Sequence, residues 1–298
     1  MLKRIGLFVL TNLAILVMLS IIMTIVSWVF GVNFGQIAGS NQNYGTLLIY
    51  AAIIGFTGSI ISLFMSQTMA KSTMALQMID VENPRNGVER WLVEVITKLA
   101  EIKGVAMPEV GIYHGEPNAF ATGPSKNNSL VAVSDGLLAS MNREEVEAVL
   151  AHEMSHVANG DMVTMTLMQG VINTFVVFLS RVIGNIVDRV ILRNEEDGPG
   201  AGYFITSLVL DIVLGLLGSM LVMAYSRHRE FQADAGAAKA LGSTVPMINA
   251  LARLGGQPAN ELPGNVKGFG INGGIGSLFA SHPSIEERIK ALRELQVK

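Results

Sequence analysis

Long apolar stretches alternate with polar segments along the chain. The first two, residues 5–30 and 44–65, contain no charged residue. Because about 20 apolar residues in a helix cross a hydrocarbon core, we predict that residues 1–66 form a transmembrane hairpin. A cleaved signal peptide is the alternative for the first stretch, but its apolar region would be shorter. Trp28 and Phe30 at the end of that stretch are typical of an interfacial anchor.

Two later apolar stretches, 162–179 and 205–224, are also long enough to span a bilayer. Each contains residues that are costly in lipid, such as Asn173 in the first and Asp211 in the second. We predict that both span or dip into the membrane, with buried helices of an enzymatic domain as the alternative. Three basic residues between them would fit a cytoplasmic segment better than an outside loop: Arg181, Arg189 and Arg193.

The basic residues near the first two stretches predict the orientation. Lys3 and Arg4 precede the first stretch, the loop 31–43 has no Lys or Arg, and five basic residues follow Met65 before residue 104. The positive-inside bias places the N-terminus and the segment after Met65 in the cytoplasm. The expected location is therefore the cell (inner) membrane, with several spans.

Shorter periods appear after the second stretch, within the predicted domain 67–298. Residues 88–104 repeat apolar side chains at a four-residue spacing and end in a glycine, which predicts a helix. Three short apolar runs follow, at 109–115, 118–123 and 129–138, and turn residues separate them. They predict three strands. The expected fold class is a mainly α membrane protein with a small β-sheet.

The helix predicted next contains candidate catalytic residues. Asn142 and Glu145 fit a capping box that opens it. His152 and His156 are four residues apart on one face, the spacing at which two imidazoles reach one tetrahedral zinc ion. In hydrolases of this pattern, the residue at Glu153 accepts a proton from the attacking water. Core histidines that hold no metal are the alternative.

A catalytic zinc site needs a third protein ligand. A third histidine six residues after the second is absent, because position 162 is Met. The polar segment 225–241 is predicted to be helical and offers Glu230 and Asp234, four apart on one face. Glu230 could bind the metal while Asp234 accepts the N–H of a ligand histidine. The alternative is that segment 225–241 is a solvated helix face that binds no metal. If Glu230 is not the third ligand, Asp234 or Asp161 would take its place; Asp161 is otherwise an N-cap for the next helix.

Composition supports a membrane protein. Half of the residues are hydrophobic and 15% are charged, which is too apolar for an ordinary soluble domain. The net charge of −3 gives no indication of nucleic-acid binding. The chain has no cysteine, so any metal must be held by nitrogen and oxygen ligands.

The chain resembles the HtpX family of bacterial membrane zinc metalloproteases, which are relatives of the CAAX prenyl proteases and of the mitochondrial peptidase OMA. Besides the two N-terminal spans, four segments in the same order carry the resemblance: "PNAFATG" at 117–123, "HEMSH" at 152–156, "SRHREFQAD" at 226–234 and "SHPSIEER" at 281–288. It implies a zincin-like (gluzincin) α+β metalloprotease domain. It also implies one zinc ion per chain, bound by His152, His156 and Glu230, with Glu153 as base.

Two further assignments combine this resemblance with chemistry. His282 would donate to the charge that develops on the scissile oxygen, with Arg288 as a supporting cation. The alternative is that Pro283 opens a C-terminal helix with Arg288 on its solvated face. An edge strand would let an extended substrate add by backbone hydrogen bonds; its residues would be Asn118, Ala119, Phe120 and Ala121.

The expected function is that of an integral membrane zinc endopeptidase. Its partners would be the lipid bilayer and membrane-protein substrates, with the resemblance implying misfolded or damaged ones and a stress response. The alternatives are a specific processing peptidase of the prenyl-protease type and a non-enzymatic membrane scaffold with structural zinc. The glycine-rich segment 255–277 is either a linker or a flap over the cleft. The sequence does not indicate the oligomeric state.

Overall fold

The computed structural model describes residues 17, 19–31, 33–34, 37–38, 42–255 and 282–296. The chain folds into two compact units. One contains residues 1–62 and 166–222, and the other contains residues 63–165 and 223–298. The glycine-rich segment predicted as a linker or flap lies outside the described residues, apart from Gly255.

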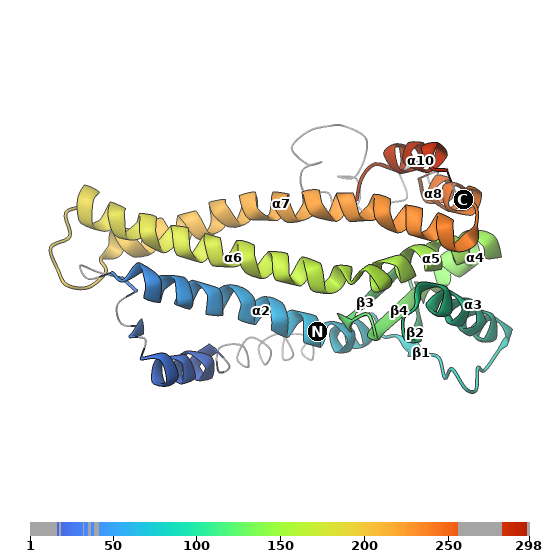
Figure 1. Cartoon of the computed structure of the whole chain (residues 1–298), viewed down its shortest axis with the longest axis horizontal. Helices are drawn as coiled ribbons and strands as arrows, with labels where there is room; N and C mark the ends of the chain where they lie inside the picture. Colours follow the sequence, from blue (N-terminus) through green and yellow to red (C-terminus); the bar gives the residue numbers. More distant parts are fainter. Residues whose placement is uncertain are drawn as a thin grey trace. The chain divides into compact units, whose positions relative to one another are not determined.

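Three described helices are long and apolar enough to cross a membrane, judged by length and composition (Figure 1). They are α2 (Tyr44–Thr73), α6 (Asp161–Ile186) with a π-helical continuation (Val187–Ile191), and α7 (Ala201–Leu241). Each contains one of the predicted apolar stretches and extends beyond it. Half of the first predicted span lies outside the described residues, and its described end is helical over Leu19–Phe30.

Small residues let the helices of the first unit approach one another closely. A Cβ atom added to Gly55 of α2 would lie 2.5 Å from Thr174 Oγ1 of α6. A Cβ atom on Gly218 of α7 would overlap the side chain of Ile172 of α6. Close backbone approach at glycine is typical of packed membrane helices, where tight van der Waals contact replaces the hydrophobic drive.

An ion pair joins α6 to α7 inside their apolar parts. Arg181 Nη1 lies 2.7 Å from Asp211 Oδ2, and the Ser180 hydroxyl donates to Asp211 Oδ1 at 2.5 Å. Arg181 thus belongs to a helix and not to the connecting loop, where its charge had seemed to oppose spanning. Pairing also explains how Asp211 is tolerated in an apolar helix, because each charge offsets the cost of the other.

We expect the Arg181–Asp211 pair to behave as a coupled unit. Asp211→Leu and Arg181→Leu should each lower the free energy of unfolding in detergent by about 2 kcal/mol, because each removes a charged hydrogen bond. The double substitution should cost less than the sum, because it leaves no unpaired charge. Thermal unfolding of the four proteins measures this, and simple additivity would show that the pair contributes nothing.

The second unit contains a four-stranded sheet in the order β1-β2-β4-β3. Its strands are β1 (Gln77–Met78), β2 (Glu109–Tyr113), β3 (Ala119–Ser125) and β4 (Asn128–Ser134). β2 and β4 are parallel, whereas the other two pairs are antiparallel. β4 lies inside the sheet and is almost entirely buried, while β3 forms one edge.

Two details of the sheet differ from the sequence prediction. The strand predicted over 129–138 ends at Ser134, because the Ser134 hydroxyl accepts from Leu137 N and opens the short helix α4 (Asp135–Ser140). The strand β1 was not predicted, since two residues are too few for an alternating pattern to be recognised.

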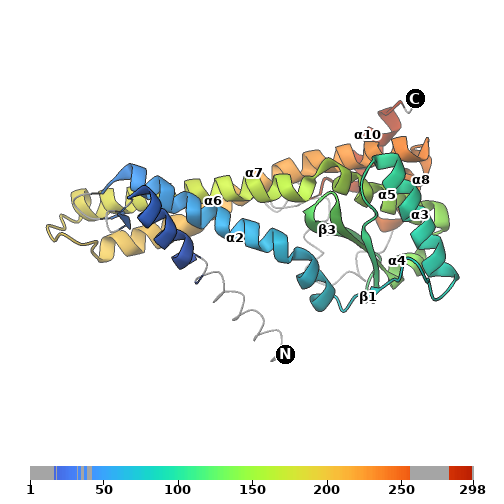
Figure 2. The same ribbon diagram turned by 60° about the horizontal axis from the view of Figure 1, so that its bottom comes forward.

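Helices cover this sheet (Figure 2). α5 (Arg143–Asn159) packs against β3 and β4, and α3 (Gly87–Lys103) and α8 (Val245–Gly255) pack against α5. α10 (Ile285–Glu294) packs on α8. The predicted helix 88–104 is confirmed, with Asn86 as its N-cap and Gly104 ending it at φ 64°. The buried core therefore surrounds α5, the helix that carries the histidine pair.

Candidate metal centre and active site

Both ends of α5 are fixed by local chemistry. The Asn142 side chain accepts from Glu145 N while the Glu145 carboxylate accepts from Asn142 N, so the predicted capping box is confirmed. Gly160 ends the helix at φ 68°, a left-handed conformation that glycine adopts without strain. His152 and His156 consequently lie one turn apart, with their Nε2 atoms separated by 3.1 Å.

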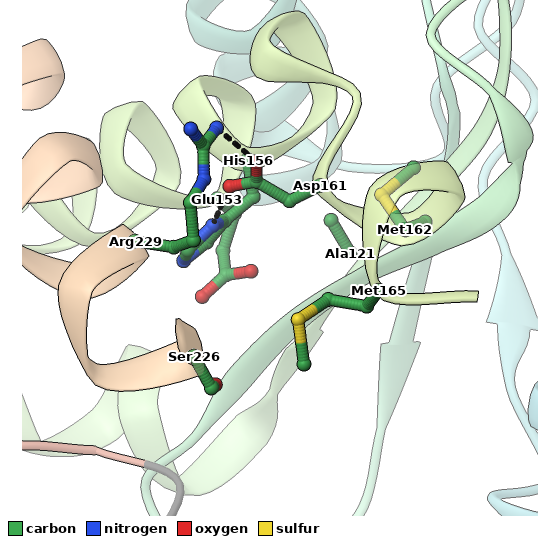
Figure 3. A pocket seen from close by; sticks show the side chains of 8 residues that line it. All are labelled: Ala121, Glu153, His156, Asp161, Met162, Met165, Ser226 and Arg229. Carbon is green, nitrogen blue, oxygen red and sulfur yellow. Dashed lines mark hydrogen bonds and ion pairs between the residues drawn. The ribbon is translucent and has the colours of Figure 1, made fainter. Parts of the chain in front are cut away.

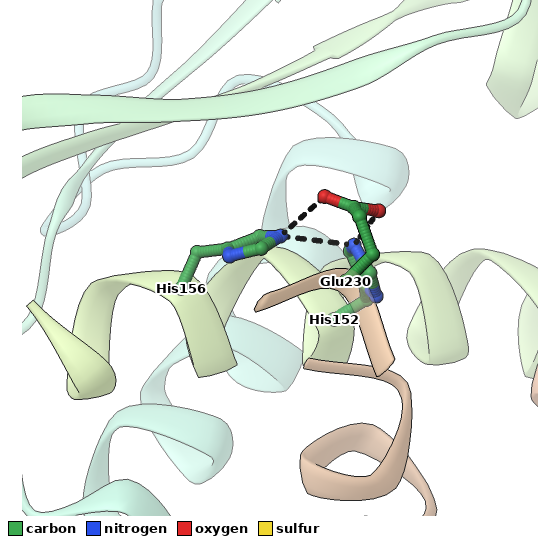
Figure 4. A group of neighbouring side chains, drawn as sticks. All are labelled: His152, His156 and Glu230. Atoms are coloured by element: carbon green, nitrogen blue, oxygen red, sulfur yellow. Dashed lines mark hydrogen bonds and ion pairs between the residues drawn. The ribbon is translucent and has the colours of Figure 1, made fainter. Parts of the chain in front are cut away.

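Glu230 reaches this pair from α7 (Figure 4). Its Oε1 atom lies 3.3 Å from His156 Nε2, and its Oε2 atom lies 3.4 Å from His152 Nε2. One ligand atom from each of the three side chains can be chosen so that all lie within 4.8 Å of one another. Two tetrahedral zinc ligands with bonds of about 2.05 Å lie about 3.3 Å apart, so the spacing fits one ion.

The hydrogen bonds of the histidines suit a set of metal ligands. Asp234 Oδ1 lies 2.9 Å from His152 Nδ1, and Asp161 Oδ2 lies 2.7 Å from His156 Nδ1. Each carboxylate accepts an Nδ1–H, which leaves the Nε2 lone pairs facing one another and Glu230. Glu230 is buried, and its Oε2 atom lies 2.8 Å from His282 Nδ1 and 3.2 Å from Arg288 Nη1. Two nitrogen lone pairs and a carboxylate fit a divalent metal ion.

The electrostatics of α5 agree with that fit. Burial lowers the pKa of His156, but the neighbouring carboxylates of Asp161 and Glu230 raise it to about 10. Burial also lowers the pKa of His152, but the carboxylates of Asp234 and Glu230 raise it above its ordinary value. These acidic groups therefore favour positive charge at the centre, which a bound metal ion would supply. Burial raises the pKa of Glu153, as suits a group that takes and returns a proton.

An arginine pairs with each of the two carboxylates behind the histidines. Arg288 of α10 donates to Asp234 with two nitrogens, at 2.8 and 2.6 Å. Arg229 of α7 pairs with Asp161 (Figure 3). Two chains of the type His–Asp–Arg thus converge on the centre. Each arginine compensates a buried negative charge and holds the carboxylate in place.

The other predicted site residues lie around the same centre. His282 Nδ1 is 2.8 Å from Glu230 Oε2, and the His282 side chain is 57% exposed. Arg288 is buried, with Nη1 3.2 Å from Glu230 Oε2, so its donors face carboxylates. Their roles at the scissile oxygen stay predictions. Asn118 lies just before β3, and its carbonyl accepts from Ser134 N at 2.9 Å.

Sequence reasoning missed the roles of Asp161 and Arg229. The sequence indicates Asp161 only as an N-cap or a substitute ligand, and it places Arg229 in the polar segment 225–241 without a role of its own. The signal that could have found Asp161 is its position directly after Gly160, where the chain turns back toward His156. Arg229 gives no such signal, because its partner is distant in sequence.

The comparisons with known proteins agree with this geometry. The family model described as Peptidase family M48 matches residues 86–296. The chain belongs to peptidase family M48. The proteins named "Protease HtpX homolog" from Paracidovorax citrulli and Acidovorax ebreus are 57% and 56% identical over 296 residues. Each alignment covers 99% of this chain and 99% of the relative. The resemblance to the HtpX family is therefore confirmed.

A solved structure supports the M48 fold. The crystal structure of S. mikatae Ste24p matches with a TM-score of 0.56 and 21% sequence identity, which shows the fold alone. The match covers 83% of this chain, and this chain spans 58% of the Ste24p chain. The chain is therefore a membrane metalloprotease. The M48 family and the HtpX relatives show the metalloprotease, and the three described helices that are long and apolar enough to cross a membrane agree with a membrane protein.

We expect Asp161→Asn to weaken metal binding about 10–100-fold, the usual cost of losing an outer-shell partner. The amide can still accept from His156 Nδ1, but it no longer increases the basicity of the ring. Competition with a chromogenic zinc chelator measures the affinity. Asp135→Asn is the matched control, because Asp135 also binds a histidine, His114, but at an exposed position outside the site. Equal affinity in both variants would contradict the assignment.

Proposed function

We propose that this M48 protease is a zinc-dependent endopeptidase that hydrolyses peptide bonds of membrane proteins. The observation that supports the proposal is the convergence of the two histidine Nε2 atoms and the buried Glu230 carboxylate next to Glu153. In the described part of the chain this group comprises three side chains, His152, His156 and Glu230. Catalytic zinc has three protein ligands, whereas structural zinc normally has four, so the scaffold alternative is disfavoured.

A bound zinc ion supplies Lewis-acid activation of water and of the peptide carbonyl. Glu153 takes a proton from the attacking water while the oxygen of that water adds to the carbonyl carbon. Glu153 then returns the proton to the leaving amine as the C–N bond breaks. Asp234 and Asp161 hold the imidazoles of His152 and His156 in the tautomer that directs Nε2 inward.

His282 and Arg288 are assigned different roles in this proposal. His282 is solvent-accessible and close to Glu230, so it can donate to the carbonyl oxygen as negative charge develops there. Arg288 is buried against Asp234 and Glu230. Its contribution is to position those carboxylates, with a long-range effect on the oxyanion.

The substrate is proposed to bind along the edge strand β3, which includes Ala119, Phe120 and Ala121, with Asn118 at its entry. Within the described residues β3 is hydrogen-bonded to β4 on one side, which leaves its other side for an extended peptide. Backbone hydrogen bonds are independent of sequence. This mode of binding suits a protease that removes many misfolded or damaged membrane proteins.

Glu153→Gln should keep zinc bound but lower cleavage of an unfolded protein in detergent by about 10²–10⁴-fold, the usual contribution of a general base. Zinc content and turnover are measured on the same preparation. Glu147→Gln on the same helix is the control, because Glu147 pairs with Lys98 outside the site. Cleavage by Glu153→Gln at the parental rate would refute the base assignment.

We further propose that residues 1–66 form a hairpin in the cell inner membrane and that 67–298 form the enzymatic domain, with two additional spans. The N-terminus and the active site would face the cytoplasm. The distribution of basic residues around the first two stretches supports this orientation.

A single introduced thiol tests the orientation, because the chain has no cysteine. Glu195→Cys, between α6 and α7, should react with an impermeant maleimide in intact cells. Lys126→Cys, exposed in the turn between β3 and β4, should react only after the membrane is permeabilised. Protection of position 195 or labelling of position 126 in intact cells would contradict the proposed topology.

A further inference from the structure

A small cavity opens beside Glu153 (Figure 3). Its volume is about 180 Å³, and its walls include Ala121 of β3, Met162 and Met165 of α6, and Ser226 of α7. The Glu153 carboxylate points into the open space that Met165 and Ser226 border. Binding sites for drug-sized ligands occupy about 300–1,000 Å³, so this cavity has room for one side chain and not for a whole ligand.

The walls of the cavity favour an apolar guest. Ala121, Met162 and Met165 present methyl, methylene and thioether groups. The charged and polar groups of the walls are paired with one another: Arg229 pairs with Asp161, and His156, which also lines the cavity, contacts Asp161 and Glu230. An acidic side chain would meet Glu153 and Asp161, and a basic one would lose its hydration without a free partner other than the catalytic base. Methionine side chains are flexible and adapt to several apolar shapes.

The position of the cavity relates it to the bond that is cut. Glu153 lines the cavity and is also the residue next to the metal ligand His152, while Ala121 belongs to the strand proposed to bind substrate. A peptide that adds to β3 directs alternate side chains to this face. A side chain in the cavity therefore belongs to a residue that flanks the scissile bond.

We propose that this cavity is a specificity pocket for a medium-sized aliphatic side chain, such as that of Leu, next to the scissile bond, and that Met165 sets its size. The inference rests on the proposed function, since a pocket of this kind requires a peptide substrate. Such a pocket would give the protease a side-chain preference at one residue of the substrate, in addition to its recognition of the substrate backbone by β3.

Two assays test the pocket. The first follows cleavage of otherwise identical peptides in which Ala, Leu or Phe flanks the cut on either side. The second measures binding of hydroxamate dipeptides with an isobutyl or a benzyl side chain to the zinc-loaded protein, and it needs no turnover. The parent should prefer Leu and isobutyl. Met165→Ala should raise the ratio of the cleavage rate of the Phe peptide to that of the Leu peptide at least tenfold. It should raise the ratio of benzyl to isobutyl hydroxamate affinity by a similar factor, because one or more methylenes in an apolar pocket are worth about 10–200-fold.

Matched variants separate a pocket effect from general damage. Met165→Phe should move preference the other way, toward Ala, by filling the space. Leu167→Ala, an exposed position two residues further along α6, should leave both ratios unchanged. Unaltered ratios in both Met165 variants, in either assay, would overturn the pocket. A shift in hydroxamate binding without peptide cleavage by the parent would retain the pocket and reject the endopeptidase.

Discussion

The mutual repulsion of electron-rich groups is the constraint on which the active site depends. His152 Nε2, His156 Nε2 and the Glu230 carboxylate are gathered within van der Waals distance in a buried place. In a buried place with little water to screen it, such an arrangement needs compensating positive charge. Arg288 Nη1, 3.2 Å from Glu230 Oε2, supplies part of that charge, and a bound cation would supply more. The groups around these three side chains fix their positions and supply compensating charge. Asp161 and Asp234 fix the ring orientations, and two arginines neutralise those carboxylates in turn.

The same constraint explains how the fold is used. α5 is largely buried and both of its ends are capped, so its two histidines are held in fixed positions relative to one another. The remaining candidate ligand, Glu230, comes from α7, and Arg288, which contacts it, comes from α10. Rigidity is therefore concentrated where two ligands share one helix, while the third depends on tertiary packing.

The sequence was informative wherever the signal was local. Helical period and capping residues predicted α3 and α5, and spacing within α5 paired His152 with His156. Run length predicted where the apolar helices lie but not where they end, because polar residues such as Arg181 can continue a helix when a partner like Asp211 is available. The parallel pairing of β2 with β4 could not be predicted from alternation, which describes one strand at a time.

Site residues follow the same division. Glu230 and Asp234 could be proposed because they share a helix face, whereas the pairing of Arg229 with Asp161 joins segments far apart in sequence. No pattern within either segment reports that contact. Spacing within each of the two helices, α5 and α7, therefore identified the candidate ligands. The groups that support them, such as Arg229, were identified only by three-dimensional packing.

The length and continuity of α7 have a consequence for biosynthesis. This helix begins with its apolar part at Ala201 and reaches Glu230 and Asp234 near its other end. A ribosome must therefore complete both α6 and the apolar part of α7 before the third ligand is made. If His152, His156 and Glu230 are the ligands, as proposed, a partly translated chain lacks the third ligand. Proteolytic competence then arises only after α7, the last of the described membrane-capable helices, has been synthesised.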